Sequence, residues 1–181
     1  FQYFQKPAPA LQSLAGGKGV VYLGTFSKIL LPSIRMSFMV LPVELTSAYE
    51  EKKDCYNQTA SKAEQIALTQ FIRDGHLERQ IRKSRKIHMT KATIFAEQAE
   101  KVWGKEVNAV IDESGFHVIL EIPSRYNVEE FEGVARKEGI ALLPAGESGG
   151  KIKLGFVCTN VETEVYYGVL KKLKELLESS F

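Results

Sequence analysis

The sequence predicts an α/β chain of the α+β type, in which helices cover one face of a mainly antiparallel sheet. Three features of its 181 residues predict this class. Two short apolar runs flank a polar loop within residues 20–42, and a long helical pattern spans residues 77–103. After residue 107 the patterns follow in the order strand, strand, helix, strand, strand, helix. This order is typical of helices packed on one side of an antiparallel sheet.

The first segment indicates two strands joined by a polar loop. Val20–Leu23 is a β-branched and aromatic run that suits a buried strand, and Gly24 is expected to end it. A second apolar run covers residues 36–41, with Pro32 before it and Pro42 after it. Because ligands of α/β proteins commonly bind beyond strand ends, we expect any chemistry to lie in the loop between these strands.

That loop contains residue types that suit an aldehyde bearing a phosphate. Lys28 can form a Schiff base with an aldehyde once desolvation or a nearby cation lowers its pKa. Arg35 offers a permanently charged fork for a phosphate, and the hydroxyls of Thr25 and Ser27 add donors. Pyridoxal 5′-phosphate (PLP) combines these two groups. From spacing alone, a solvated lysine beside hydroxyls that cap a turn is the simpler interpretation.

Helical patterns follow the second strand. Residues 43–56 are rich in Glu and Lys and are expected to be helical. Ser61 and Glu64 have the spacing of a capping box, which predicts a helix that continues to Arg73. Gly75 is expected to end that helix, because glycine readily adopts the left-handed backbone found after helices.

The long helix, expected over residues 77–103 and closed by Gly104, is strongly basic in its first half. A basic cluster on a helix is a possible surface for nucleic acid or for an acidic partner. No aromatic side chains are interleaved with it and no reading motif is present, so a solvated face opposite an apolar stripe is the favoured interpretation. The cluster comprises Arg79, Arg82, Lys83, Arg85, Lys86, His88 and Lys91.

The remaining residues predict the layered α+β part of the chain. Asn127 is a suitable N-cap for its first helix, and Gly139 ends that helix. Residues 145–152 are a near miss to a nucleotide P-loop and lie between strands, so a P-loop is rejected. The expected strands are 107–111, 116–122, 140–143 and 151–157, with a turn at 112–115, a loop at 144–150 and a last helix over 162–178.

Charge balance, cysteine and histidine spacing and the lengths of apolar runs give no sign of a nucleic-acid-binding, metal-binding or membrane-spanning protein. Lysine and arginine number 24 against 22 acidic residues, a balance that alone implies neither nucleic acid nor a membrane surface. Cys55 and Cys158 are far apart and outside any metal-binding motif, so we expect reduced thiols in a cytoplasmic protein. The three histidines have no ligand-like spacing, so no metal is expected, and no apolar run is long enough for a membrane span.

The residues around the loop carry a resemblance to a known family. Tyr22–Lys28 and Leu31–Pro42 resemble the PLP-lysine segment of fold-type-I aminotransferases. Within that superfamily they look most like the aminotransferase-like domain of MocR/GabR-type transcriptional regulators, which belong to the GntR family. The resemblance implies that Lys28 binds PLP covalently and is the catalytic lysine. It also implies that Arg35 binds the phosphate and that Thr25 and Ser27 lie beside it.

The resemblance also implies a layout and a set of partners. Residues 1–56 would end the large PLP-binding domain, 57–104 would connect the domains, and 105–181 would form the small C-terminal domain. The chain would be a C-terminal fragment that lacks the DNA-binding domain of a regulator. Partners would be an amino-acid or amine effector, DNA through the missing domain, and a second copy in a homodimer, with no membrane.

One position departs from the family pattern. Lys153 matches the place where many aminotransferases carry an arginine for the substrate α-carboxylate. Lysine attracts a carboxylate but lacks the bidentate geometry of arginine, so Lys153 is either a substrate-binding residue or an exposed strand residue. Two alternatives to a sensor domain stay open: a free-standing PLP-dependent aminotransferase, and a packing fragment without cofactor.

Overall fold

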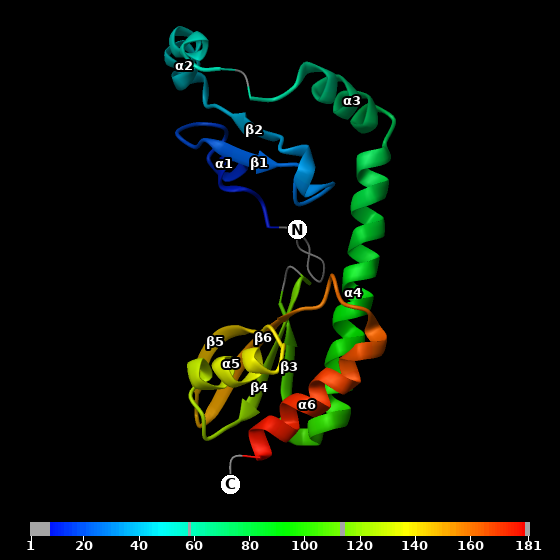
Figure 1. The fold of residues 1–181 in the computed structure, drawn as a ribbon. Coiled ribbons are helices and arrows are strands. Elements are labelled where there is room, and N and C mark those ends of the chain that lie inside the picture. The colour runs from blue at the N-terminus through cyan, green and yellow to red at the C-terminus, as the bar shows by residue number, and fades with distance from the viewer. Residues whose placement is uncertain (1–7, 58, 113–114, 180–181) are drawn as a thin grey trace. The chain divides into compact units, whose positions relative to one another are not determined.

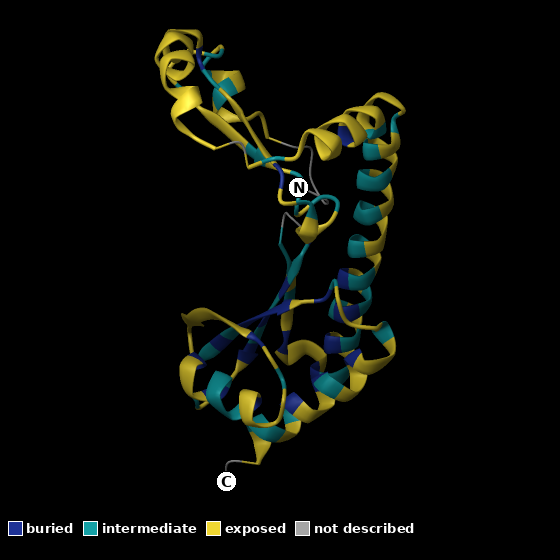
Figure 2. Ribbon diagram, turned by 45° about the horizontal axis from the view of Figure 1, so that its top comes forward, coloured by how far each residue is buried: buried dark blue, intermediate teal, exposed yellow. Residues whose placement is uncertain are grey.

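The computed structural model describes residues 8–57, 59–112 and 115–179. It divides into two compact units: among the described residues, the N-terminal unit extends to Lys83 and the C-terminal unit begins at Ser84 (Figure 1). Buried residues gather mainly in the unit that contains the larger sheet (Figure 2).

The N-terminal unit contains a two-stranded sheet and several short helices. Its strands and α-helices are α1 (Leu11–Leu14), β1 (Tyr22–Thr25), β2 (Ser37–Val40), α2 (Thr46–Lys52) and α3 (Lys62–Arg73). Short 3-10 helices cover Pro32–Ile34, Val43–Leu45 and Lys53–Cys55. The region expected to be one helix over residues 43–56 is thus a 3-10 turn, a helix of two turns and a second 3-10 turn.

The strand pair is antiparallel, with Tyr22 opposite Val40 and Gly24 opposite Phe38. The prediction that Gly24 ends the first strand is wrong, because this glycine lies inside β1. A Cβ atom at Gly24 would lie only 2.2 Å from the Phe38 ring, so glycine allows that ring to cover the strand. The same ring packs at 5.3 Å, centroid to centroid, from the ring of Phe26.

The ends of α3 agree only in part with the sequence pattern. Ser61 occupies the N-cap position with extended backbone angles, but its side chain makes no capping hydrogen bond. The predicted capping box is therefore wrong. Gly75 lies just beyond the helix with φ of 72°, and its N–H donates to the Ile72 carbonyl, which confirms it as the terminating residue.

The C-terminal unit is a four-stranded antiparallel sheet with helices. The sheet order is β3-β4-β6-β5, and every neighbouring pair is antiparallel, which confirms the predicted class. The long helix α4, which begins in the N-terminal unit, confirms the helix predicted over 77–103. The elements are α4 (His76–Trp103), β3 (Asn108–Ile111), β4 (His117–Pro123), α5 (Val128–Lys137), β5 (Leu143–Ser148), β6 (Lys151–Val157) and α6 (Tyr166–Glu178), with 3-10 turns at Gly104–Glu106 and Thr163–Val165.

The boundaries of β5 differ from the prediction. A strand was expected over 140–143 and a loop over 144–150, but the strand covers Leu143–Ser148. All six of its residues are exposed, so the strand lacks the alternation of apolar and polar residues from which it could be predicted. Pro144 fits because β5 is at the edge of the sheet, and the pairing shifts register between Pro144 and Gly146. The predicted turn at 112–115 lies partly outside the described residues.

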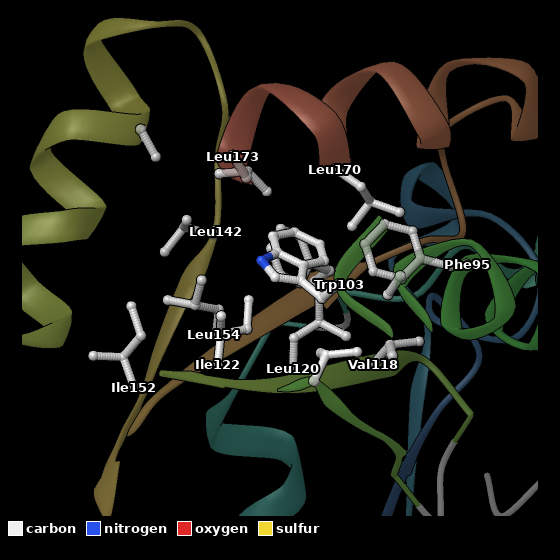
Figure 3. Close-up of a cluster of buried hydrophobic side chains, with 14 of the residues drawn as sticks. Phe95, Trp103, Val118, Leu120, Ile122, Leu142, Ile152, Leu154, Leu170 and Leu173 are labelled. Atoms are coloured by element: carbon white, nitrogen blue, oxygen red, sulfur yellow. The ribbon is translucent and has the colours of Figure 1, made fainter. Parts of the chain in front are cut away.

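The core of this unit lies between one face of the sheet and the helices. Every second residue of β4 is buried, and Ile152, Leu154 and Phe156 of β6 follow the same alternation, as expected for strands with a single covered face. Figure 3 shows Leu170 and Leu173 of α6 directed toward Trp103 of α4 and toward the sheet. The buried apolar side chains of the two strands are Val118, Leu120, Ile122, Ile152, Leu154 and Phe156.

The helix α5 begins with a complete capping box. The side chain of Asn127 accepts a hydrogen bond from the Glu130 N–H at 2.8 Å, and the Glu130 carboxylate accepts one from the Asn127 N–H at 3.2 Å. Asn127 is therefore confirmed as the N-cap. The Glu147 carboxylate of β5 accepts a further hydrogen bond from the Val128 N–H at 2.6 Å. These contacts attach the edge strand to the start of the helix.

Two buried side chains that can lose a proton, the thiol of Cys158 and the hydroxyl of Tyr166, predict a loss of stability at high pH. Burial raises the pKa of the Cys158 thiol from 9.0 to about 12 and that of the Tyr166 hydroxyl from 10.0 to about 12. Both groups keep their protons when folded at a pH where the unfolded chain has lost them. Their stabilisation is therefore complete below about pH 9 and is lost as pH rises toward about 12. Denaturant unfolding across this range should show a shallower decline for Cys158→Ala than for the unchanged protein, and parallel declines would contradict the assignment.

Candidate functional site

The candidate site is the loop that joins β1 to β2, and hydrogen bonds close it at its base. The Phe26 N–H donates to the Met36 carbonyl at 3.0 Å, and the Thr25 hydroxyl donates to the same oxygen at 3.3 Å. The Thr25 oxygen in turn accepts from the Ser27 N–H at 3.2 Å. The Thr25 hydroxyl therefore fixes the turn in which Ser27 lies.

Lys28 lies in the turn directly after this base. The turn is closed by the N–H groups of Ile29 and Leu30, which donate to the Phe26 carbonyl at 3.1 and 2.9 Å. The Lys28 side chain is exposed, whereas those of Ser27 and Ile29 are half-buried. A hydrogen-bonded turn therefore places the Lys28 side chain at the surface of the N-terminal unit.

Arg35 occupies an unusual backbone conformation at the far end of the loop. Its φ is 45°, and it is the only described residue other than glycine with a positive φ. Such a conformation costs on the order of 1 kcal/mol for an L-residue and is common at binding sites. Its side chain is exposed and makes no hydrogen bond or ion pair with another described residue. Neighbouring Met36 is buried, which anchors the chain immediately after Arg35.

Lys153 belongs to the C-terminal unit and already has an acidic partner. It lies in β6 directly opposite Glu121 of β4, and its Nζ is 2.9 Å from Glu121 Oε1. Asn108 donates to the other Glu121 oxygen at 2.9 Å. The hydrogen bonds from Asn108 and Lys153 lower the pKa of Glu121, so this carboxylate is anionic at neutral pH. Sequence reasoning missed Glu121, because only the strand register brings it opposite Lys153.

The other sequence-predicted candidates show no chemical site. Among the described residues, no group of three or more His, Cys, Asp or Glu side chains could hold a metal ion. His117 Nδ1 lies 2.8 Å from Asp112 Oδ2, and the rings of His76 and His88 pack against Phe71 and Phe116. The rejected P-loop forms the β5–β6 hairpin and leads into a strand. In the described part of the chain, no helix has the length and apolarity that a membrane crossing requires.

Comparison with known proteins decides the family. No family model matches the chain. The HTH-type transcriptional regulator YdeL of Bacillus subtilis, itself uncharacterised, is 33% identical over 180 residues, which are 96% of this chain and 38% of YdeL. The probable rhizopine catabolism regulatory protein MocR of Rhizobium meliloti is 24% identical over 80% of this chain and 29% of MocR.

A solved structure agrees with these relatives. The α-aminoadipate aminotransferase LysN of Thermus thermophilus, solved with N-(5′-phosphopyridoxyl)-L-leucine, is 26% identical with a TM-score of 0.69. The match covers 98% of this chain and 47% of LysN. The chain is a MocR-like member of the fold-type-I aminotransferase superfamily. It spans well under two thirds of the length of the regulators and the aminotransferase that it matches.

The close packing of the Phe38 ring on Gly24 leads to a prediction about the β1–β2 pair, which carries the candidate loop of this MocR-like chain. Gly24→Ala should destabilise the β1–β2 pair by up to about 1 kcal/mol, because the new methyl group overlaps the Phe38 ring and this 38% exposed ring must turn aside. Gly133→Ala in α5 is the matched control, since its new methyl group meets no atom within 4 Å. Amide hydrogen exchange would measure the effect as lost protection in β1 and β2. Equal protection of these strands in both variants would contradict the packing.

Proposed function

We propose that the chain provides the lysine segment and the small domain of a PLP-binding, effector-sensing domain in a MocR/GabR-type regulator of the GntR family. The observation that carries this proposal is the YdeL match, which spans 96% of the chain and includes the Lys28 loop. The LysN likeness supports the cofactor, because that aminotransferase was solved with a phosphopyridoxyl ligand.

The residues of the loop fit a phosphate-bearing aldehyde. Lys28 has an exposed side chain that ends in an amine, the group that captures an aldehyde, and Arg35 is a cation without an ion pair among the described residues. The Ser27 hydroxyl likewise makes no hydrogen bond with a described residue and can donate to a phosphate oxygen. The Thr25 hydroxyl is different, since its proton is directed at the Met36 carbonyl. We therefore assign Thr25 chiefly to positioning the Ser27 turn.

PLP supplies an aldehyde for amine capture and a ring that accepts electrons. Lys28 Nζ would hold the cofactor covalently, and Arg35 and Ser27 would hold its phosphate through charge-assisted hydrogen bonds. Lys28 Nζ would be the group with which an amine effector competes for the cofactor. The released Lys28 amine would then be available to hold a proton beside the bound effector. Sensing requires only that an amine effector takes the place of Lys28. Transamination also requires that Lys28 transfers a proton.

We further propose the partners of the whole protein. The effector would be an amino acid or another amine, and DNA would be bound through an HTH domain in a cytoplasmic homodimer. Exposed apolar residues on the strand pair support burial against further protein, with Leu23 71% and Met39 46% exposed. Lys153 is a candidate for an effector carboxylate, which would have to compete with Glu121 for its amine.

A free-standing aminotransferase is the second candidate, and the likeness to LysN favours it. The two are separated by adding amino acids to the PLP-loaded protein produced from the complete gene. A sensor should show a spectral change and altered DNA binding without release of a keto acid. Sustained release of a keto acid with a second keto acid as acceptor would establish an enzyme. Absence of PLP binding would leave the third candidate, a packing domain without cofactor.

A further inference from the structure

The first half of α4 carries a stripe of exposed basic side chains. Arg79, Arg82, Lys83 and Lys86 follow the spacing i, i+3, i+4 and i+7, which places them on one face of this continuous helix. All four are exposed. We call these four residues the basic stripe. It lies within a single element whose regular backbone is long enough, at 28 residues, to hold the four side chains in register.

The fold does not use the charges of the basic stripe. None of its four residues makes an ion pair or a side-chain hydrogen bond with another described residue. Lys91, by contrast, donates to the carbonyls of Thr159 and Val161 at 3.2 and 2.9 Å and so attaches α4 to the loop before α6. Glu78 is the one acidic residue in the helix before residue 97. A chain with a net charge of only +2 thus concentrates uncompensated positive charge on one helix face.

We propose that the basic stripe binds the phosphate backbone of duplex DNA. The stripe spans seven residues of rise, about 10 Å, and duplex DNA presents about six phosphate charges over that axial length. Residues 76–94 of α4 include no Phe, Tyr or Trp on which unpaired bases could stack, which disfavours single-stranded nucleic acid. The relative YdeL is an HTH-type regulator, a class of protein that binds DNA and would bring DNA close to such a surface.

This contact goes beyond the proposed function, because it needs neither PLP nor an effector and lies outside any HTH domain. Four cations on backbone phosphates give affinity without base recognition. The stripe would therefore extend the footprint of the protein beyond the bases that an HTH domain recognises. Its contribution would be independent of DNA sequence and strongly dependent on salt.

The test compares two variants of the protein produced from its complete gene. The first replaces Arg79, Arg82, Lys83 and Lys86 with alanine. The second, a matched control, removes four exposed lysines outside the stripe that have no ion pair among the described residues: Lys52, Lys101, Lys105 and Lys137. Fluorescence anisotropy with a mixed-sequence duplex measures the dissociation constant over a series of salt concentrations. Circular dichroism confirms that both variants keep the helix content of the unchanged protein.

The stripe variant should bind the duplex at least about tenfold more weakly, and its salt dependence should fall by up to about 3–4 in log–log slope, as expected for four lost phosphate contacts. The control should keep most of the slope. Equal losses in both variants would assign the effect to net charge and would overturn the proposal. An unchanged duplex affinity combined with lost binding to polyglutamate would also overturn it, in favour of an acidic protein partner.

Discussion

Replacement of Lys28 by alanine is expected to abolish covalent attachment of PLP to the protein. The loop between β1 and β2 contains no other lysine, and its hydrogen-bonded turn places the Lys28 side chain at the surface of the N-terminal unit. Without Nζ the cofactor can be held only by its phosphate contacts. The variant should lose all borohydride-stable cofactor and should release PLP during dialysis, as measured by absorbance and intact mass.

Two further variants sharpen this result. Lys28→Arg keeps the positive charge but has no amine able to capture an aldehyde, so it should also lose the covalent attachment. Lys18→Ala removes an exposed lysine just before β1 and should retain full attachment. Full attachment in Lys28→Ala would contradict the role of this residue. Loss in Lys18→Ala as well would show that the assay follows total lysine content.

Replacement of Phe95 by alanine is expected to unfold much of the C-terminal unit. Its ring is only 3% exposed and lies 5.1 Å from the Phe156 ring and 5.2 Å from the Tyr166 ring, measured between centroids. It therefore joins α4 to both β6 and α6. A buried Phe→Ala change costs about 3–5 kcal/mol, a large share of the stability of a domain of this size.

The matched control is Tyr167→Ala, because Tyr167 neighbours Tyr166 but is 52% exposed. Urea unfolding followed by circular dichroism would compare the two variants. The control should change the free energy of unfolding by less than about 1 kcal/mol. Similar losses in both variants would contradict the central place of Phe95 in this core.

Helices and strands could be predicted from the sequence where their apolar residues recur with a clear helical or alternating period. The strand β6 was predicted at residues 151–157, its observed bounds, because apolar and polar residues alternate along it. The helix α4 was predicted to within one residue at its start, because it has a long helical period and ends before Gly104. The strand β5 has no such pattern, since all of its side chains are exposed.

The candidate site was predictable only where it is local in sequence. Lys28 and the hydroxyls beside it stand out because they follow a strand within one loop. The positive φ of Arg35 has no sequence signal, because the residue at the end of the Pro32–Ile34 turn is an arginine and not the glycine that usually marks a left-handed conformation. The pairing of Lys153 with Glu121 depends on strand register between residues more than thirty positions apart, which spacing alone does not specify.

The central claim is that the β1–β2 loop is a PLP site, and borohydride reduction followed by peptide mapping tests it most directly. The protein from the complete gene would be incubated with PLP, reduced and digested, and its peptides identified by mass spectrometry. We expect a single phosphopyridoxyl adduct on the peptide that contains Lys28. No adduct, or adducts spread evenly over exposed lysines such as Lys18 and Lys52, would contradict the claim and favour a scaffold without cofactor.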